Sequence, residues 1–407
     1  TSFPARAPPP NNHTLLYFGA VNYDCRVWVN GHEAGHHIGG FTPFNYHITD
    51  MLQNGENTII VKVDNKRKAE AVPTQIFDWW NYCGITRDVL LVKVPPTYLE
   101  NYKLQLEKAD AKAKQRVISF KAHLNKAEAG QEVTVSISEL KLVQKLTTDA
   151  EGKVIGTLTV PAKKLTLWSP ENPKLYNVEL TWAGHTIADS IGFRTIEARG
   201  KQILLNGEPV FLRGVSIHEE KPRGGGRANS TADAHELLTW AKDMNCNFVR
   251  LAHYPHNEYA IREAERMGIM VWSEIPCYWT IAWKNEGTYA NAQRQLTDMI
   301  GRDQNRANII IWSIANETPH SPERDQFLGR LAQYARSLDD TRLISMAMEV
   351  TGASNYKNRL HDNMHEYVDV VSFNQYIGWY RDVNDAPKIE WEIPHDKPVL
   401  VSEFGGG

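Results

Sequence analysis

The hydrophobic pattern of this 407-residue chain changes its period near residue 200. Before that point apolar and polar residues alternate, which is typical of β-strands with one buried face. Val27 and Val29, for example, lead into Asn30-Gly31, a dipeptide that favours a tight hairpin turn. After that point short apolar runs alternate with segments of helical period, which predicts βα units and a parallel sheet. The chain therefore combines β domains with an α/β domain.

The first part predicts two β-sandwich domains, because Pro95-Pro96 divides it into two sets of alternating strands. In the first set Ile59, Val61 and Val63 share one face. In the second set the alternating residues are Ile118, Phe120, Ala122 and Leu124, then Val133, Val135 and Ile137, then Tyr176, Val178, Leu180 and Trp182. The second set fits an immunoglobulin-like sandwich. We expect domains at residues 1–95, 96–196 and 197–407.

The pattern of residues 197–407 predicts a (β/α)8 TIM barrel that lacks its last unit. Seven apolar runs lie near Val210, Phe248, Ile269, Ile309, Leu343, Val368 and Val399. Helical stripes lie between them, at Leu237, Trp240, Ala241 and Met244 and at Ala292, Leu296, Met299 and Ile300. A closed barrel needs eight strands, so we expect sequence to be missing beyond Gly407. The chain opens at Thr1 rather than Met, so a signal peptide that was removed or never included stays open. We expect the first sandwich to be incomplete as well.

Composition excludes several classes of protein. Lys and Arg total 45 against 48 Asp and Glu, so no basic excess is available for a nucleic acid partner. No apolar run approaches the ~20 residues of a membrane span, so we expect no membrane partner. The four cysteines are too widely spaced for a disulfide framework. The cellular compartment and a homo-oligomeric state stay open.

Two glutamates end strand runs of the predicted barrel. The fourth run ends in Asn316-Glu317 and the seventh in Glu403. Because active sites of such barrels form where the strands end, we expect both carboxylates at one mouth, at a separation of ~5 Å. That spacing is typical of retaining glycoside hydrolysis, in which one carboxylate attacks the sugar and the other protonates the leaving oxygen. The alternative is that each Glu caps a loop or pairs with an Arg.

These residues resemble the motifs of glycoside hydrolase family 2. Trp312 to Glu317 looks like the family's acid/base motif, Ser402 to Gly405 like its nucleophile motif, and Phe248 to Pro255 like its second-strand signature. Val27 to Gly31 with Gly39-Gly40 is similar to its jelly-roll-like sugar-binding sandwich, and Leu167 to Pro173 to its immunoglobulin-like domain. The family's order of sandwich, immunoglobulin-like domain and barrel matches the order that the periodicity predicts.

The resemblance implies Glu317 as acid/base, Glu403 as nucleophile and Asn316 as donor to the sugar 2-hydroxyl. It also implies that Tyr376 hydrogen-bonds the nucleophile. Further substrate-binding candidates are Asp78, His218, Arg250, His253, Trp379 and Tyr380. Asp78 belongs to a block, Asp78 to Arg87, that is similar to the sandwich loop reaching the barrel mouth. The alternatives are a surface turn for Asp78, structural histidines for the two His, and core packing for Trp379.

The implied activity is that of an exo-acting, retaining β-glycosidase that uses water and needs no cofactor or metal. The Asp78 block and the Gly-Trp-Tyr after the sixth run look closer to β-glucuronidases than to β-galactosidases, which remain the alternative. The Asn and Lys with which the family's glucuronidases bind the sugar carboxylate fall beyond Gly407. A galactosidase would raise the question of magnesium, for which we see no ligand cluster. A protein of another class, a non-catalytic carbohydrate-binding relative or an inactive fragment, also stays open.

One motif points to a different chemistry. His32-Glu33-Ala34-Gly35-His36 matches the zinc-protease pattern, which requires a helix to bring both His to one face. The neighbouring glycines and the preceding β pattern predict an extended segment instead, with the two His ~13 Å apart. Gly224-Gly225-Gly226 lacks the Lys-Ser/Thr of a phosphate loop, and we expect a loop at the barrel mouth there.

Overall fold

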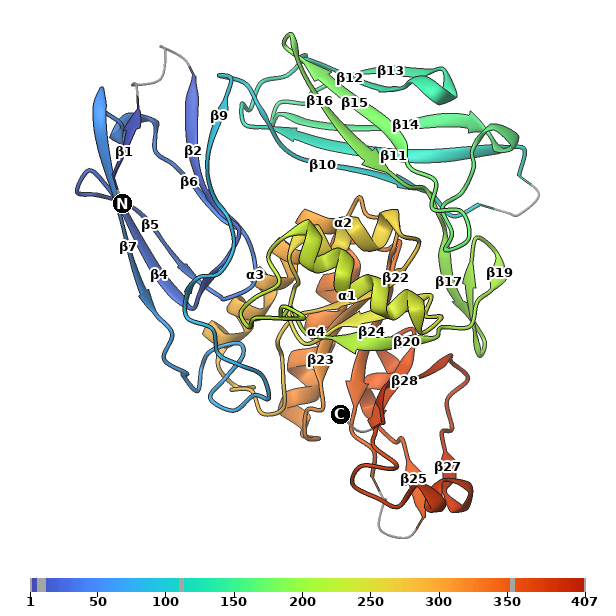
Figure 1. The fold of residues 1–407 in the computed structure, drawn as a ribbon. Helices are drawn as coiled ribbons and strands as arrows, with labels where there is room; N and C mark the ends of the chain where they lie inside the picture. Colours follow the sequence, from blue (N-terminus) through green and yellow to red (C-terminus); the bar gives the residue numbers. More distant parts are fainter. Residues whose placement is uncertain (1, 6–11, 110–112, 352–355, 406–407) are drawn as a thin grey trace. The chain divides into compact units, whose positions relative to one another are not determined.

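The computed structural model describes residues 2–5, 12–109, 113–351 and 356–405. The chain forms two compact units. The first unit holds residues 1–66, 81–194 and 304–307, and the second holds 67–80, 195–303 and 308–407. The segment 67–80 therefore lies within the first sandwich in sequence but belongs structurally to the second unit. Figure 1 shows the elements in chain order.

The first sandwich packs two antiparallel sheets around a small core. One sheet has the order β1-β7-β4-β5 and the other β6-β2-β9. The strands are β1 (Ser2–Ala5), β2 (His13–Phe18), β4 (Asp24–Val29), β5 (His32–Ile38), β6 (Phe44–His47), β7 (Gly55–Asp64) and β9 (Val89–Val94), with a short pair β3 (Val21–Asn22) and β8 (Gly84–Ile85). Asn30 and Gly31 both have positive φ, 49° and 84°, between β4 and β5. The hairpin predicted there is confirmed.

The second sandwich also belongs to the first unit. Its sheets have the orders β10-β11-β14 and β13-β12-β15-β16. The strands are β10 (Leu99–Leu106), β11 (Gln115–Leu124), β12 (Glu132–Ile137), β13 (Leu142–Thr147), β14 (Lys153–Pro161), β15 (Tyr176–Trp182) and β16 (His185–Ile191). All the alternating residues predicted to face the core of this sandwich are buried, so the period-two interpretation is confirmed.

The second unit is a nearly closed parallel barrel of seven strands among the described residues. Their order is β20-β21-β22-β23-β24-β26-β28, and Ser216 Oγ donates to Ser402 O at 3.3 Å between the first and last strands. The strands are β20 (Gly214–Ile217), β21 (Phe248–Leu251), β22 (Met270–Glu274), β23 (Ile309–Asn316), β24 (Leu343–Met348), β26 (Val371–Gln375) and β28 (Val399–Phe404). The predicted fold class, two sandwiches followed by a TIM barrel, is confirmed.

Within the described part of the unit, four α-helices pack around these strands (Figure 1), namely α1 (Thr231–Asp243), α2 (Glu258–Arg266), α3 (Glu286–Asp303) and α4 (Pro322–Leu338). Ser230 and Ser321 cap α1 and α4, each accepting a backbone N–H from the first turn. The unit also contains β17 (Ile196–Arg199), β18 (Gln202–Leu205) and β19 (Glu208–Pro209) before the barrel, and β25 (Lys357–Arg359) and β27 (Glu390–Glu392) within it. Every residue of β23 is buried, as a central parallel strand requires.

Three details of the barrel differ from the sequence prediction. The first strand is β20, which begins at Gly214, four residues after Val210, and has only two apolar residues larger than glycine, Val215 and Ile217. The sixth strand begins at Val371, three residues after Val368. In α1 the buried residues are Ala234, Leu238 and Ala241, whereas Trp240 and Met244 are 42% and 58% exposed. The buried stripe therefore lies one residue away from the predicted one.

Candidate active site

Glu317 and Glu403 lie at the carboxyl ends of two barrel strands. Glu317 directly follows β23, and Glu403 is the penultimate residue of β28. Glu317 has a φ of 46°, in the left-handed region that non-glycine residues rarely occupy. Its backbone N–H donates to Ala347 O at 2.8 Å on the neighbouring strand. Strained backbone of this kind is concentrated at functional sites, because surrounding contacts must maintain it.

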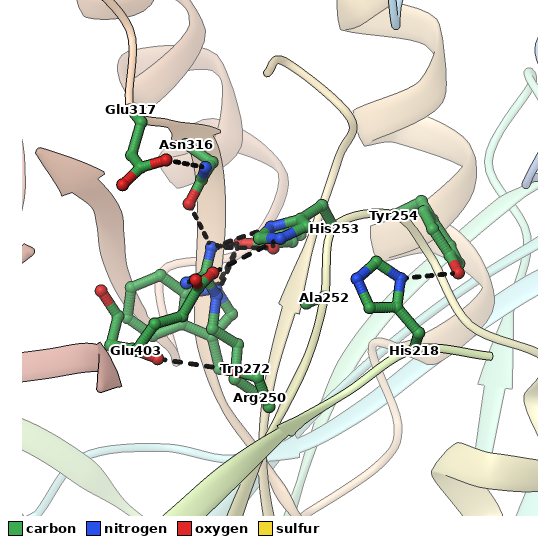
Figure 2. Close-up of polar contacts among 12 residues, drawn as sticks. His218, Arg250, Ala252, His253, Tyr254, Trp272, Asn316, Glu317 and Glu403 are labelled. Atoms are coloured by element: carbon green, nitrogen blue, oxygen red, sulfur yellow. Dashed lines mark hydrogen bonds and ion pairs between the residues drawn. The ribbon is translucent and has the colours of Figure 1, made fainter. Parts of the chain in front are cut away.

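Arg250, on β21, connects the surroundings of the two glutamates. It is 1% exposed, so its charge must be balanced inside the barrel. Its Nη1 donates to Glu403 Oε1 at 2.8 Å, and its Nη2 donates to Asn316 Oδ1 at 2.7 Å. Asn316 Nδ2 in turn lies 3.4 Å from Glu317 Oε2 (Figure 2). One guanidinium and one carboxamide therefore separate the two carboxylates.

The amide of Asn316 is oriented by two donors. Its Oδ1 accepts from Arg250 Nη2 and, at 3.1 Å, from Asn374 Nδ2. Asn374 is held in turn by Ser402, whose Oγ donates to Asn374 Oδ1 at 2.8 Å. With its oxygen occupied, Asn316 presents the Nδ2 donors on the side of Glu317. A donor fixed beside the acid/base candidate is what a sugar 2-hydroxyl ligand requires.

A third glutamate, Glu274, is the last residue of β22 and contacts Arg250 and His253. It is 1% exposed and accepts hydrogen bonds from Arg250 Nη2 at 3.0 Å and from Trp272 Nε1 at 2.7 Å. Its Oε1 also lies 2.9 Å from His253 Nδ1. Burial opposes its ionisation, but the charge of Arg250 and the bond to His253 outweigh burial and hold the pKa of Glu274 at about 2. Glu274 is therefore an anion at any pH near neutrality.

Glu403 has a partner on each carboxylate oxygen. Arg250 donates to Oε1, and His253 Nε2 lies 3.4 Å from the same atom. The hydroxyl of Tyr376, which follows β26, donates to Oε2. Burial and the bond to Glu403 raise the pKa of Tyr376 above its ordinary value, so it stays a donor. The hydrogen bond expected between Tyr376 and Glu403 is present.

The segment 67–80 reaches the same mouth within the second unit. Thr74 Oγ1 donates to Thr280 O at 3.1 Å, and Gln295 Nε2 donates to Val72 O at 2.8 Å. Next to the exposed Asp78, Trp79 packs against the ring of His253, with a centroid distance of 5.8 Å. Burial, together with the charges of Glu317, Asp78 and Glu403, raises the pKa of Tyr278. The charge of Asp78 thus acts on the same tyrosine as the charges of the two glutamates.

His218 follows β20 and is neutral near pH 7. Burial and the nearby His253 lower the pKa of His218 to about 3. Its Nδ1 lies 3.1 Å from the Tyr254 hydroxyl, and Figure 2 shows this pair set apart from Arg250 and Glu403. The rings of His218 and His253 meet edge to face at 5.4 Å. His218 therefore contacts the site through His253.

Trp379 and Tyr380 are the least connected of the predicted residues. Trp379 is 55% exposed and Tyr380 is 77% exposed, which excludes core packing for Trp379. The ring of Tyr380 meets that of Tyr376 edge to face at 5.6 Å. Through Tyr376 these aromatic side chains adjoin the site, and their exposed faces are available for a flat ligand surface.

Several residues of the site were missed by sequence reasoning. They are Trp79, Glu274, Tyr278, Trp279 and Asn374. Glu274 ends the third strand run, so the criterion that identified Glu317 and Glu403 would have found it too. Trp279, which donates its Nε1 to Glu317 Oε2 at 3.2 Å, gives no such signal, because it lies in the loop after that strand.

The described residues contain no group of three or more His, Cys, Asp or Glu placed to hold a metal ion. The segment of the zinc-protease pattern is strand β5, which confirms the predicted extended conformation. His36 there lies 2.8 Å from Asp24. Within the described part of the chain, no helix has the length and apolarity needed to cross a membrane.

Comparison with protein families covers all three regions of the chain. Residues 196–406 match the TIM barrel domain of glycosyl hydrolases family 2, residues 10–95 its sugar binding domain, and residues 97–194 a further domain of the family. The chain belongs to glycosyl hydrolase family 2. The three matches follow one another along this chain in the order that the resemblance of the motifs predicted.

Relatives of this family 2 chain include several enzymes named for uronic acids. A putative beta-glucuronidase of Formosa agariphila is 31% identical over 96% of this chain, which spans 48% of that protein. The structure of an uncultured Clostridium beta-glucuronidase is 26% identical with a TM-score of 0.82, covering 99% of this chain and 72% of the other. A beta-galacturonidase of Eisenbergiella tayi is 26% identical with a TM-score of 0.83, covering 99% and 72%.

Proposed function

We propose that this family 2 chain carries the active site of an exo-acting β-glucuronidase that retains the anomeric configuration. The observation that carries the proposal is the position of Arg250, which donates to Glu403 and also to Asn316 beside Glu317. Double displacement uses two neighbouring carboxylates and hydrogen bonds to the sugar 2-hydroxyl, and the contacts of Arg250 support Glu403, Glu317 and Asn316 in these roles. The names of the Formosa and Clostridium relatives support the glucuronide as the substrate.

In the first step Glu317 protonates the glycosidic oxygen while Glu403 attacks the anomeric carbon. The bond to the aglycone breaks, and a covalent ester forms between the sugar and Glu403. In the second step Glu317, now a carboxylate, takes a proton from water, and this water displaces Glu403 from the anomeric carbon. Tyr376 and Arg250 hold one carboxylate oxygen of Glu403 each, which restricts rotation of the nucleophile.

The proposal is tested with three 4-nitrophenyl glycosides: β-D-glucuronide, β-D-galacturonide and β-D-galactoside. We expect the glucuronide to give the highest kcat/KM. A preference for the galacturonide or the galactoside would replace the proposed substrate and keep the mechanism. In the same assay Glu403→Gln is expected to lose at least about 10³-fold in kcat, as other enzymes do when their nucleophile is removed. Equal rates for parent and variant would exclude Glu403 as the nucleophile.

A further inference from the structure

Glu274 makes more contacts in the site than either proposed catalytic glutamate, yet the proposed reaction gives it no role. It cannot donate a proton to the leaving group, because it is an anion held by Arg250 and its pKa is about 2. It cannot attack the sugar, because its side chain is 1% exposed and both carboxylate oxygens already accept hydrogen bonds, Oε1 from Arg250 and Oε2 from Trp272. Burying an anion of this kind costs free energy unless its partners balance the charge and occupy its hydrogen-bonding positions.

The contacts of Glu274 fix the plane of the Arg250 guanidinium. Nε and Nη2 of Arg250 lie 3.3 and 3.0 Å from Glu274 Oε2, so one edge of the guanidinium binds the carboxylate. The remaining nitrogen, Nη1, faces Glu403. Such two-point contacts set orientation as well as energy, because the guanidinium is planar and rigid. The orientation in which Arg250 Nη1 binds Glu403 therefore depends on Glu274.

Glu274 also orients His253. Nη2 of Arg250 lies 3.0 Å from Glu274 Oε1, 2.7 Å from Asn316 Oδ1 and 3.2 Å from His253 Nδ1. Because an ionised carboxylate can only accept hydrogen bonds, His253 Nδ1 is the donor in its 2.9 Å contact with Glu274 Oε1. Nε2 of the same ring lies 3.4 Å from Glu403 Oε1. Glu274 thus acts on the nucleophile through two different side chains.

We infer that Glu274 is a positioning residue, which holds Arg250 and His253 so that Glu403 and Asn316 meet the sugar in the reactive geometry. The inference rests on the proposed function. Replacement by Gln keeps the size of the side chain but removes the charge that binds both partners. A misplacement of about 1 Å in such a site costs about 10²-fold in rate, so we expect a loss of that order in kcat with little change in KM.

The test uses Glu274→Gln and Glu274→Asp with Glu263→Gln as the matched control. Glu263, on α2, is 5% exposed and likewise pairs with an arginine, Arg266 at 2.5 Å, and with a histidine, His235 at 2.6 Å. Kinetics are measured with 4-nitrophenyl and 2,4-dinitrophenyl β-D-glucuronide, and active sites are counted with a 2-fluoro glycoside that traps the covalent intermediate. Melting temperatures are recorded for all variants.

The expected result is a kcat loss in Glu274→Gln that persists with the dinitrophenyl leaving group, which departs without protonation and depends only on the nucleophile. Glu274→Asp should recover part of the rate because it keeps the charge, and the control should retain the parent kcat. Three results would each overturn the inference while leaving the proposed function intact. They are a parent-like kcat in Glu274→Gln, an equal loss of kcat in the control, and a loss of kcat that disappears with the dinitrophenyl substrate. A parent that hydrolyses no glycoside would overturn both.

Discussion

The indole Nε1 of Trp279 donates a hydrogen bond to Glu317 Oε2 at 3.2 Å. Trp279 has a φ of 54°, so the residues at both ends of this bond occupy left-handed backbone. Tyr278, the residue before Trp279, packs against Trp79 with a ring distance of 5.1 Å. The loop after β22 therefore connects the proposed acid/base residue with the segment 67–80 inside the second unit.

This bond predicts a specific effect on leaving-group protonation. Trp279→Phe keeps an aromatic ring but removes the N–H that orients Glu317. Hydrogen bonds to charged groups contribute about 1.5–3 kcal/mol, so we expect a fall in kcat of at least about tenfold for alkyl β-glucuronides, whose leaving groups need the acid. The 2,4-dinitrophenyl glucuronide should be hydrolysed at nearly the parent rate.

Trp283→Phe is the matched control for this variant, because Trp283 packs edge to face on Phe327 at 5.2 Å and is not bonded to either proposed catalytic glutamate. Both variants are assayed with the two leaving groups. If Trp279→Phe slowed both substrates equally, the indole would have no special relation to the acid step.

His218 predicts how stability responds to acid. Burial lowers its pKa from 6.5 to about 3, so the unfolded chain binds this proton more readily than the folded chain. The contribution of neutral His218 is therefore complete above pH 6.5 and is lost as the pH falls from 6.5 towards 3. The free energy of unfolding falls by about 1.4 kcal/mol for each pH unit below 6.5, so the loss at pH 5 is up to about 2 kcal/mol.

The corresponding measurement is urea unfolding of the parent and of His218→Gln at pH 7 and pH 5. Gln does not titrate, so the variant should lose less stability between the two pH values than the parent. An equal drop in the free energy of unfolding for both proteins would show that His218 does not carry this dependence.

The ion pair of Arg324 and Asp362 predicts a large loss of stability. Both side chains are buried, and Arg324 binds Asp362 with two nitrogens, at 2.7 and 2.5 Å. Arg324 Nε also donates to Thr318 Oγ1 at 3.0 Å, next to Glu317. Asp362→Asn leaves a buried positive charge with less compensation, which costs about 3–5 kcal/mol.

Asp325→Asn serves as its control, since Asp325 contacts the same arginine at 2.6 Å from a more exposed position, and we expect a loss below about 1 kcal/mol. Chemical denaturation of both variants gives the comparison. Similar losses in the two would contradict the assignment of the buried pair as the dominant interaction.

The strand conformation of the segment with the zinc-protease pattern predicts that glucuronide hydrolysis does not depend on a metal ion. In β5 the side chains of His32 and Glu33 are exposed, and His36 pairs with Asp24 across the hairpin. Because a strand does not bring His32 and His36 to one ion, EDTA and His32→Ala should leave glucuronide hydrolysis unchanged. Inhibition by EDTA that zinc reverses would show that a metal site exists after all.

Periodicity predicted the architecture, and the strand runs predicted that Glu317 and Glu403 lie where strands end. Alternation was reliable in the sandwiches because each strand buries one face, as at Val133 and Val135. It failed at β20, where Gly214 must be small because a Cβ there would lie 2.5 Å from Phe248 O. Side chains that enter the site from loops, such as Trp79 and Trp279, depend on long-range packing that no local pattern encodes.

Arg250 illustrates the same limit. Its motif was identified, but its function of connecting Glu403, Asn316 and Glu274 requires four strands to converge. The sequence indicates that a buried charge at a strand end needs partners, without indicating which partners it has.

In the proposed mechanism Glu403 forms a covalent bond with the sugar. A 2-deoxy-2-fluoro-β-glucuronyl fluoride should inactivate the protein. The 2-fluorine slows both formation and breakdown of the intermediate, and the reactive fluoride leaving group keeps formation faster than breakdown, so the intermediate accumulates. Digestion and mass spectrometry then locate the added sugar. We expect one sugar per chain on the peptide that contains Glu403. A sugar on Glu317 or on any other residue would exclude Glu403 as the nucleophile.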